Sequence, residues 1–167
     1  NKSWYTNGQL KSDEKKEEGI SKTWHINGQL KSEVLIKEGK YNGLYREWNK
    51  NGVLFRKFNY KDEHLLKFQL YDENEQILVQ GDLNSENTKI SLSYWHNTGQ
   101  MIKTINLSLG KKMHYTGSIP LFTRKNWCNQ DLPNYQKGLL KNPKVKIDGL
   151  VQEWYTNGQI KFEGNYI

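Results

Sequence analysis

The amino-acid sequence predicts an all-β protein, an array of stacked antiparallel β-hairpin repeats that forms an elongated curved sheet. Three observations support this prediction. The chain of 167 residues contains no alanine, the best helix former, and is rich in the aromatic and β-branched residues that favour strands. An eight-residue pattern recurs along the chain. Asn-Gly lies inside four of its copies, and between strand-forming residues this dipeptide is the strongest short signal for a hairpin.

The recurring octet predicts the elements in order. Its seven copies begin at Trp4, Trp24, Trp48, Tyr71, Trp95, Met113 and Trp154. The copies led by Trp4, Trp24 and Trp154 are nearly identical, with the pattern Trp-x-x-Asn-Gly-Gln-Leu/Ile-Lys, and those led by Tyr71 and Met113 are worn. Spacings of 18 to 24 residues, then one of 41, predict about seven hairpins. The residues expected to shape them are Trp4, Gly8, Trp24, Gly28, Trp48, Gly52, Trp95, Gly99, Trp154 and Gly158.

The turn inside each octet is expected to be a two-residue type I′ turn, because Asn and Gly both tolerate positive φ. With Asn27 and Gly28 at the turn, His25 would oppose Leu30 and Trp24 would oppose Lys31. One hairpin buries too little apolar surface to be stable alone, so neighbouring hairpins are expected to stabilise one another.

The chain is expected to form a single array in three parts. Residues 1–120 would hold the hairpin repeats and residues 149–167 the final repeat. Residues 121–148 would be either a basic irregular insertion or a worn repeat. No apolar run approaches the roughly 18 residues of a membrane-spanning helix. The sequence begins at Asn1 rather than Met, so loss of a leader is an open expectation, and both a cytoplasmic and an exported location stay open.

Four histidines and one cysteine are the residues that could carry nucleophilic or metal chemistry. His25 and His96 occupy the octet position that tyrosine fills in two other copies, and His114 falls in the same position of a worn copy, so a packing role is the simpler interpretation. His64 lies in a charged loop. A single cysteine, Cys128, excludes a disulfide within the chain, and nearby basic residues would favour its thiolate. No catalytic or zinc-ligand spacing accompanies these residues, so we expect no enzyme activity, no metal and no cofactor.

The pattern Gly-x4-Trp-x2-Asn-Gly-x-Leu-Lys-x-Glu resembles the bacterial variant of the MORN repeat and is especially similar to the YwqK-family antitoxins. The resemblance covers residues 4–120 and 149–165. It implies a hairpin array that acts as a binding scaffold without catalysis, with a protein partner that in some members is a toxin. Bacterial MORN proteins are often labelled as kinase-like, but neither the glycine-rich loops nor the His-Arg-Asp triplet of kinases occurs in this sequence.

The positive charge of the chain is concentrated in one segment. The net charge is +7, yet nine basic residues and one acidic residue lie between Lys103 and Lys146. A basic segment with interleaved aromatic residues is where we expect a partner to bind. The candidate partner-binding residues are Lys111, Lys112, Arg124, Lys125, Trp127, Tyr135, Lys137, Lys141, Lys144 and Lys146. A lysine-rich genomic composition is the competing explanation for the total charge.

Three kinds of partner fit a basic segment on a repeat scaffold. A protein is favoured, with a cognate toxin as the sharpest hypothesis, which would make the chain an antitoxin or immunity protein. Anionic lipid is the alternative, since each Lys or Arg near a lipid surface contributes about 1 kcal/mol. Nucleic acid ranks last, because lysines outnumber arginines 22 to 3 and phosphate and base recognition favour arginine. Oligomeric state stays open, and the exposed edge strands expected at both ends make end-to-end pairing one alternative.

Overall fold

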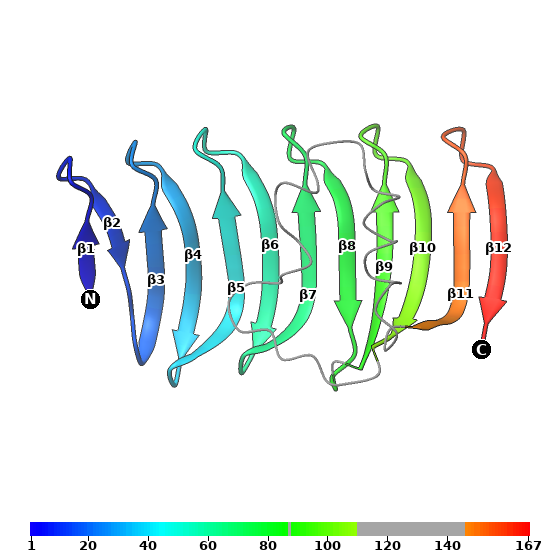
Figure 1. Ribbon diagram of the computed structural model, residues 1–167, viewed down its shortest axis with the longest axis horizontal. Coiled ribbons are helices and arrows are strands. Elements are labelled where there is room, and N and C mark those ends of the chain that lie inside the picture. Colours follow the sequence, from blue (N-terminus) through cyan, green and yellow to red (C-terminus); the bar gives the residue numbers. More distant parts are fainter. Residues whose placement is uncertain (87, 110–145) are drawn as a thin grey trace.

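The structure is a computed structural model that describes residues 1–86, 88–109 and 146–167. Within these residues, twelve strands form one antiparallel sheet in which neighbours in the chain are neighbours in the sheet (Figure 1). The strands are β1 (Lys2–Trp4), β2 (Leu10–Asp13), β3 (Glu18–Trp24), β4 (Leu30–Lys37), β5 (Lys40–Trp48), β6 (Leu54–Lys61), β7 (His64–Tyr71), β8 (Ile77–Leu83), β9 (Lys89–Trp95), β10 (Met101–Ser108), β11 (Lys146–Trp154) and β12 (Ile160–Tyr166). The predicted all-β hairpin array is therefore confirmed.

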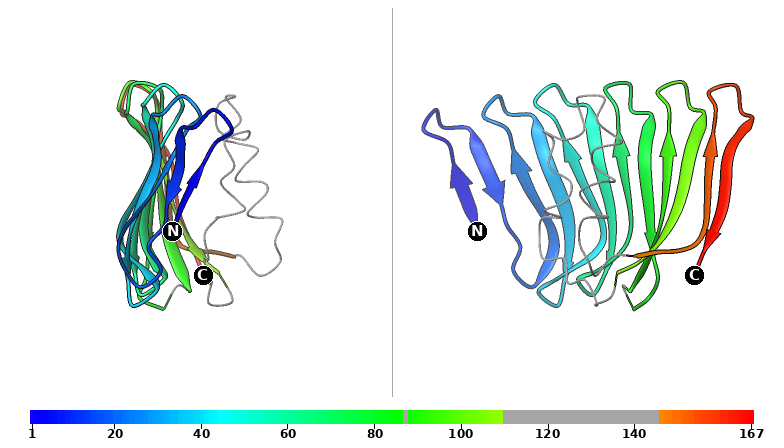
Figure 2. Two further views of the ribbon diagram at one scale, coloured as in Figure 1. Left: turned by 90° about the vertical axis from the view of Figure 1, so that its left-hand side faces the viewer. Right: turned by 45° about the vertical axis from the view of Figure 1, so that its right-hand side comes forward.

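The sheet is open and elongated. Its order runs from β1 to β12 without closing, and the two chain ends lie at opposite ends of the sheet. The side view in Figure 2 shows the strands as a bowed layer. Strands β10 and β11 pair directly although residues 109–145 separate them in the chain. The hairpin led by Trp154 therefore follows the hairpin led by Trp95 in the sheet.

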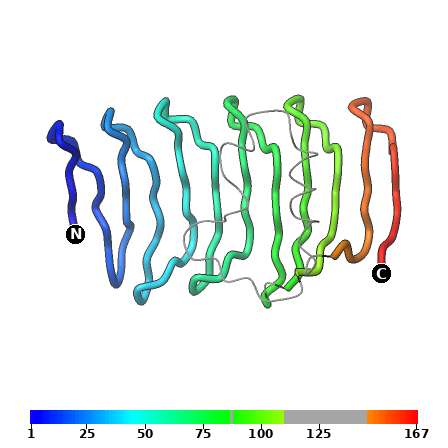
Figure 3. Tube along the Cα trace, viewed as in Figure 1, coloured from blue at the N-terminus to red at the C-terminus, as the bar shows by residue number. Residues whose placement is uncertain are grey.

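Each octet forms the loop of a hairpin. We call the six pairs β1–β2, β3–β4, β5–β6, β7–β8, β9–β10 and β11–β12 the tip hairpins. Their loops lie in a row at one end of the strands, which the backbone trace in Figure 3 shows clearly. The leading aromatic residue ends the first strand of each tip hairpin in the described chain, as at Trp24 in β3 and Tyr71 in β7.

The tip loops differ from the predicted two-residue turn. Gly28 N donates to His25 O at 2.9 Å, and His25 N donates to Gln29 O at 2.8 Å, so the loop has three residues. Only Gly28 has a positive φ (83°) there, and Asn27 does not. This is a type I turn followed by a left-handed glycine. The predicted type I′ turn is wrong because Asn27 is held in another way: its Oδ1 accepts from Gln29 N at 3.2 Å.

The longer loop changes the register of the hairpin. Trp24 pairs with Leu30, and the next pair is Thr23 with Ser32, so a β-bulge leaves Lys31 without a partner across the pair. The predicted pairings of Trp24 with Lys31 and of His25 with Leu30 are therefore wrong. A shift at the same position occurs in the other five tip hairpins, β1–β2, β5–β6, β7–β8, β9–β10 and β11–β12. A bulge increases the local twist of a hairpin, and this one recurs with the octet.

Two-residue turns with positive φ occur instead at the opposite end of the strands, between one tip hairpin and the next. Lys37 pairs with Lys40 across Glu38 (φ 52°) and Gly39 (φ 71°). Lys61 pairs with His64 across Asp62 (φ 49°) and Glu63 (φ 66°). Positive φ at both central residues defines the type I′ turn. Asp62 and Glu63 adopt it without a glycine.

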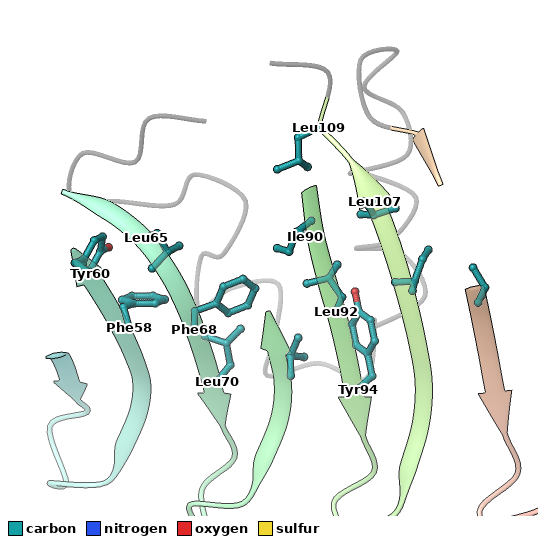
Figure 4. Packing of buried hydrophobic residues seen from close by; sticks show 13 residues of the cluster. Phe58, Tyr60, Leu65, Phe68, Leu70, Ile90, Leu92, Tyr94, Leu107 and Leu109 are labelled. Carbon is teal, nitrogen blue, oxygen red and sulfur yellow. The ribbon is translucent and has the colours of Figure 1, made fainter. Parts of the chain in front are cut away.

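The hydrophobic core lies on one face of the sheet, which we call the core face. Period-two alternation places Phe58, Phe68, Leu92, Ile105 and Val151 on it in one line across the strands. Figure 4 shows how Phe58, Phe68, Leu92 and neighbouring side chains pack. The buried cluster runs from β6 to β11, and its members are Phe58, Tyr60, Leu65, Phe68, Leu70, Val79, Ile90, Leu92, Tyr94, Ile105, Leu107, Leu109 and Val151.

Candidate interaction surface

The face opposite the core, which we call the outer face, carries one continuous line of polar residues. Successive pairings connect one residue from each strand, and none of the twelve is buried. We call this line the polar row, and it consists of Lys2, Asp13, Lys22, Glu33, Arg46, Lys57, Gln69, Gln80, Ser93, Thr104, Gln152 and Glu163. Every strand therefore presents a hydrophilic group at the same height.

Side chains in the polar row bind one another across strands. Arg46 Nη1 lies 2.8 Å from Glu33 Oε1, and Lys22 Nζ lies 3.9 Å from Glu33 Oε2. Gln69 Nε2 donates to Gln80 Oε1 at 2.9 Å farther along the row. Such exposed pairs add little stability, about 0–1 kcal/mol each. They do fix a pattern of charge on the surface, with both signs close together.

An apolar patch lies beside the charged part of the polar row. Ile20 pairs with Leu35, and a Cβ added to Gly43, the residue before Leu44, would lie 3.5 Å from Leu35 Cδ2. These side chains are on the outer face, and they are 50%, 40% and 38% exposed respectively. We call Ile20, Leu35 and Leu44 the apolar trio. Adjacent exposed apolar side chains with a charged rim are typical of protein interaction sites.

The apolar trio was not predicted, although the sequence contains a signal for it. Val34, Leu35 and Ile36 are three apolar residues in succession. In a strand, successive side chains point to opposite faces. Val34 and Ile36 are buried on the core face, so Leu35 must lie on the outer face. The run of three therefore places one apolar residue on the face that the polar row occupies.

The tip loops form a second surface, and its polar groups bond along the array. Tyr5 Oη donates to Trp24 O of the next tip hairpin at 2.8 Å, and His25 Nε2 lies 2.9 Å from Trp48 O. Tyr5 and His25 can fill the same octet position because each contacts the carbonyl of the leading tryptophan in the next tip hairpin. The half-buried His25 thus holds neighbouring hairpins together, a role more specific than the predicted packing.

The asparagine and glutamine of the octet extend these contacts. Asn7 Nδ2 donates to Ile26 O at 3.2 Å, and Asn27 Nδ2 donates to Lys50 O at 2.8 Å, each in the next tip hairpin. The side chain of Gln9 lies against Gly28, where an added Cβ would be 2.5 Å from Gln9 Oε1. In all these contacts the side chain comes from one hairpin and the backbone from the hairpin that follows. The side chains of these tip loops therefore contact the next hairpin in the array, so the two ends of the array present different groups.

Polar groups on the core face are also paired. Thr23 Oγ1 and Ser32 Oγ are 2.6 Å apart, and Arg56 Nη1 lies 3.2 Å from Glu47 Oε2. Tyr45 Oη donates to Glu47 Oε2 at 3.5 Å. Burial raises the pKa of Tyr45 far above the ordinary tyrosine value, and the Glu47 carboxylate raises it further. These contacts join strands, so we assign them a structural role.

Most of the predicted partner-binding residues lie outside the described residues. These residues are Lys111, Lys112, Arg124, Lys125, Trp127, Tyr135, Lys137, Lys141 and Lys144. Cys128, His114 and the worn octet at Met113 also lie outside the described residues. Lys146 is described: it is exposed at the start of β11 and pairs with Ser108. The basic partner site accordingly stays a prediction.

In the described part of the chain, no three His, Cys, Asp or Glu residues are grouped so that they could hold a metal ion. His96 Nδ1 lies 3.1 Å from Thr98 Oγ1 within its own tip loop. The described residues contain no helix that is long and apolar enough to cross a membrane.

Comparison with known proteins identifies repeats in the chain. Residues 17–38, 41–62 and 147–167 match the family described as MORN repeat variant. These segments coincide with the tip hairpins β3–β4, β5–β6 and β11–β12. No curated protein and no solved structure matches the chain significantly. The matched segments contain the octets led by Trp24, Trp48 and Trp154.

Proposed function

We propose that this MORN-repeat protein is a non-enzymatic scaffold that binds another macromolecule, in the first place a protein. MORN-repeat proteins are in general non-enzymatic scaffolds. The observation that carries the proposal is the apolar trio on the outer face, flanked by the ion pairs of Lys22, Glu33 and Arg46. An apolar centre provides affinity when it is desolvated, and the surrounding charges provide specificity.

Charge balance on the outer face favours protein over lipid or nucleic acid as the partner there. The polar row alternates between basic and acidic residues along its first four positions, Lys2, Asp13, Lys22 and Glu33. The whole row holds four basic residues and three acidic ones, so a protein surface that presents both signs would match it better than a polyanion. A basic binding site for anionic lipid would have to come from the segment between Lys103 and Lys146.

The test uses the 167-residue chain as bait in an extract of its source cell, with a high-salt wash. Leu35→Lys should reduce retention of the bound protein at least about tenfold, as expected for a central interface residue. Leu150→Lys is the matched control, since Leu150 is also on the outer face and also 40% exposed, but lies at the other end of the array. Equal retention by both variants would contradict the proposal.

Vesicles test the alternative. Sedimentation of the chain with anionic but not neutral vesicles, lost on charge reversal of Lys141, Lys144 and Lys146, would indicate lipid binding through the basic segment. Sedimentation that depends on Leu35 would instead indicate that the apolar trio inserts into a membrane.

The finer hypothesis is an antitoxin or immunity role against a cognate toxin. It is supported by the resemblance of the octets to the YwqK-family antitoxins. An antitoxin against a nuclease would present acidic groups that mimic nucleic acid, which the basic segment does not, so a toxin with another activity fits better. The genes that flank this one give candidate toxins. Co-expression of a candidate with the chain should restore growth, and co-expression with Leu35→Lys should not.

A further inference from the structure

We propose that copies of this chain associate head to tail, with β12 of one copy pairing with β1 of the next. Within the described residues, β1 and β12 each have one neighbour in the sheet order. This inference concerns the two edges of the array and is independent of the outer-face site.

The strand directions fit such a pairing. The second strand of each tip hairpin pairs antiparallel with the first strand of the next tip hairpin, as β2 pairs with β3 and β10 pairs with β11. Strand β12 is a second strand and β1 is a first strand. Figure 1 shows them running in opposite directions at the two ends of the sheet. One further step of the same translation therefore places β1 of a second copy beside β12.

The repeat also fixes the register of the proposed contact. In the chain, the residue eight positions after the leading aromatic residue pairs with the residue just before the next one, as in Ser12 with Thr23 and Lys103 with Glu153. The same rule pairs Phe162 with Ser3 of the next copy. The following pair is then Glu163 with Lys2, two residues of opposite charge in the polar row. The equivalent position within the chain holds the Glu33–Arg46 ion pair.

The tip loops at the two ends are complementary as well. Tyr155, Asn157 and Gln159 occupy the positions of Tyr5, Asn7 and Gln9, whose side chains contact the backbone of the next hairpin. Tyr155 is 52% exposed. At the other end, a Cβ added to Gly8 would meet no atom within 4 Å, which leaves room for a glutamine such as Gln159. Tyr155 Oη would then donate to Trp4 O of the next copy.

Such a contact differs from a closed dimer. It joins two different surfaces. An assembly of any length therefore still exposes one β1 strand and one β12 strand, and growth is open-ended. The interface has the size of one strand pairing, and small interfaces are weak. We therefore expect the average mass in solution to rise continuously with protein concentration.

Light scattering and sedimentation over micromolar to millimolar concentrations test the proposal on the 167-residue chain. Glu163→Lys puts like charges opposite each other and should lower the association constant at least about tenfold. Glu86→Lys changes the net charge equally on an exposed turn far from both edges and should leave it unchanged. Tyr155→Phe should weaken association without reversing a charge. A chain that stays monomeric, or an equal effect of Glu163→Lys and Glu86→Lys, would overturn the proposal.

Cross-linking tests the polarity and the register. In a Cys128→Ser background, a mixture of Ser3→Cys and Phe162→Cys chains should form a mixed disulfide dimer, because paired residues bring their Cα atoms close enough for a disulfide. Each variant alone should form far less. A mixture of Ser3→Cys with Glu86→Cys measures random collision, and an equal rate in the two mixtures would rule out this register.

Discussion

Phe68 reaches its place in the core because the residue opposite it is a glycine. Its side chain is only 1% exposed, and an alanine Cβ at Gly81 would overlap the ring. Gly81→Ala should therefore lower the free energy of unfolding by about 2–3 kcal/mol through overpacking. Urea denaturation measures the loss. Gly99→Ala is the control, because open space surrounds Gly99 and only its positive φ is strained, at a cost of about 1 kcal/mol. Equal losses would mean that the Phe68 ring moves freely.

The buried Tyr45 hydroxyl makes stability depend on alkaline pH. Burial, followed by the Glu47 charge, raises the pKa of Tyr45 in the folded chain, whereas unfolding returns it to about 10. The stabilisation is complete below that pH and is lost as pH rises above it, because the unfolded chain ionises first. Denaturation midpoints at increasing alkaline pH should fall less steeply for Tyr45→Phe. An equally steep fall for Tyr45→Phe and for the unchanged chain would contradict this prediction.

Turns illustrate the same energetics at the scale of an element. Glu63 is held at a φ of 66° in the turn between β6 and β7, where glycine would be unstrained. Glu63→Gly should therefore raise the free energy of unfolding by about 1 kcal/mol. Glu73→Gly is the matched control in a loop position without positive φ, and it should lower stability slightly because glycine is more flexible when unfolded. Thermal unfolding of both variants decides the sign.

The sequence was sufficient to predict the hairpins but not their loops. Octets separated by a regular spacing predict the strand order, because each hairpin neighbours the next. The loop type depends on a longer-range contact: Asn27 Nδ2 binds Lys50 O, 23 residues away, while its Oδ1 binds Gln29 N. An Asn-Gly pair considered alone favours type I′. The bulge at Lys31 follows from the longer loop and could not be predicted from local propensity.

Prediction of the candidate site was limited in a different way. The basic segment stood out because charge is visible in composition. The apolar trio did not, since exposure depends on which face of the sheet is covered. Ile20 and Leu35 are ordinary apolar residues of amphipathic strands until the register places both of them opposite the core. The alternation in β4 was the one local signal for Leu35.

Over the whole molecule, burial is uneven along the array. The buried cluster spans β6 to β11, whereas β1 and β2 contribute only the buried Ser12. In a repeat array, stability is roughly the sum of each hairpin and its contacts with neighbours, so the first hairpin should open most readily. Hydrogen exchange should show the greatest protection in β7 and β9 and the least in β1 and β2. Uniform protection would indicate a single cooperative unit.

The pairing of β10 with β11 has a consequence for the order of folding. Among the described strands, every other pairing joins segments a few residues apart, but this one joins segments that residues 109–145 separate in the sequence. Pairings between segments far apart in the sequence form more slowly than local ones. The hairpin of Trp154 should thus join the sheet late. This step should appear as a slow phase when refolding is followed by tryptophan fluorescence.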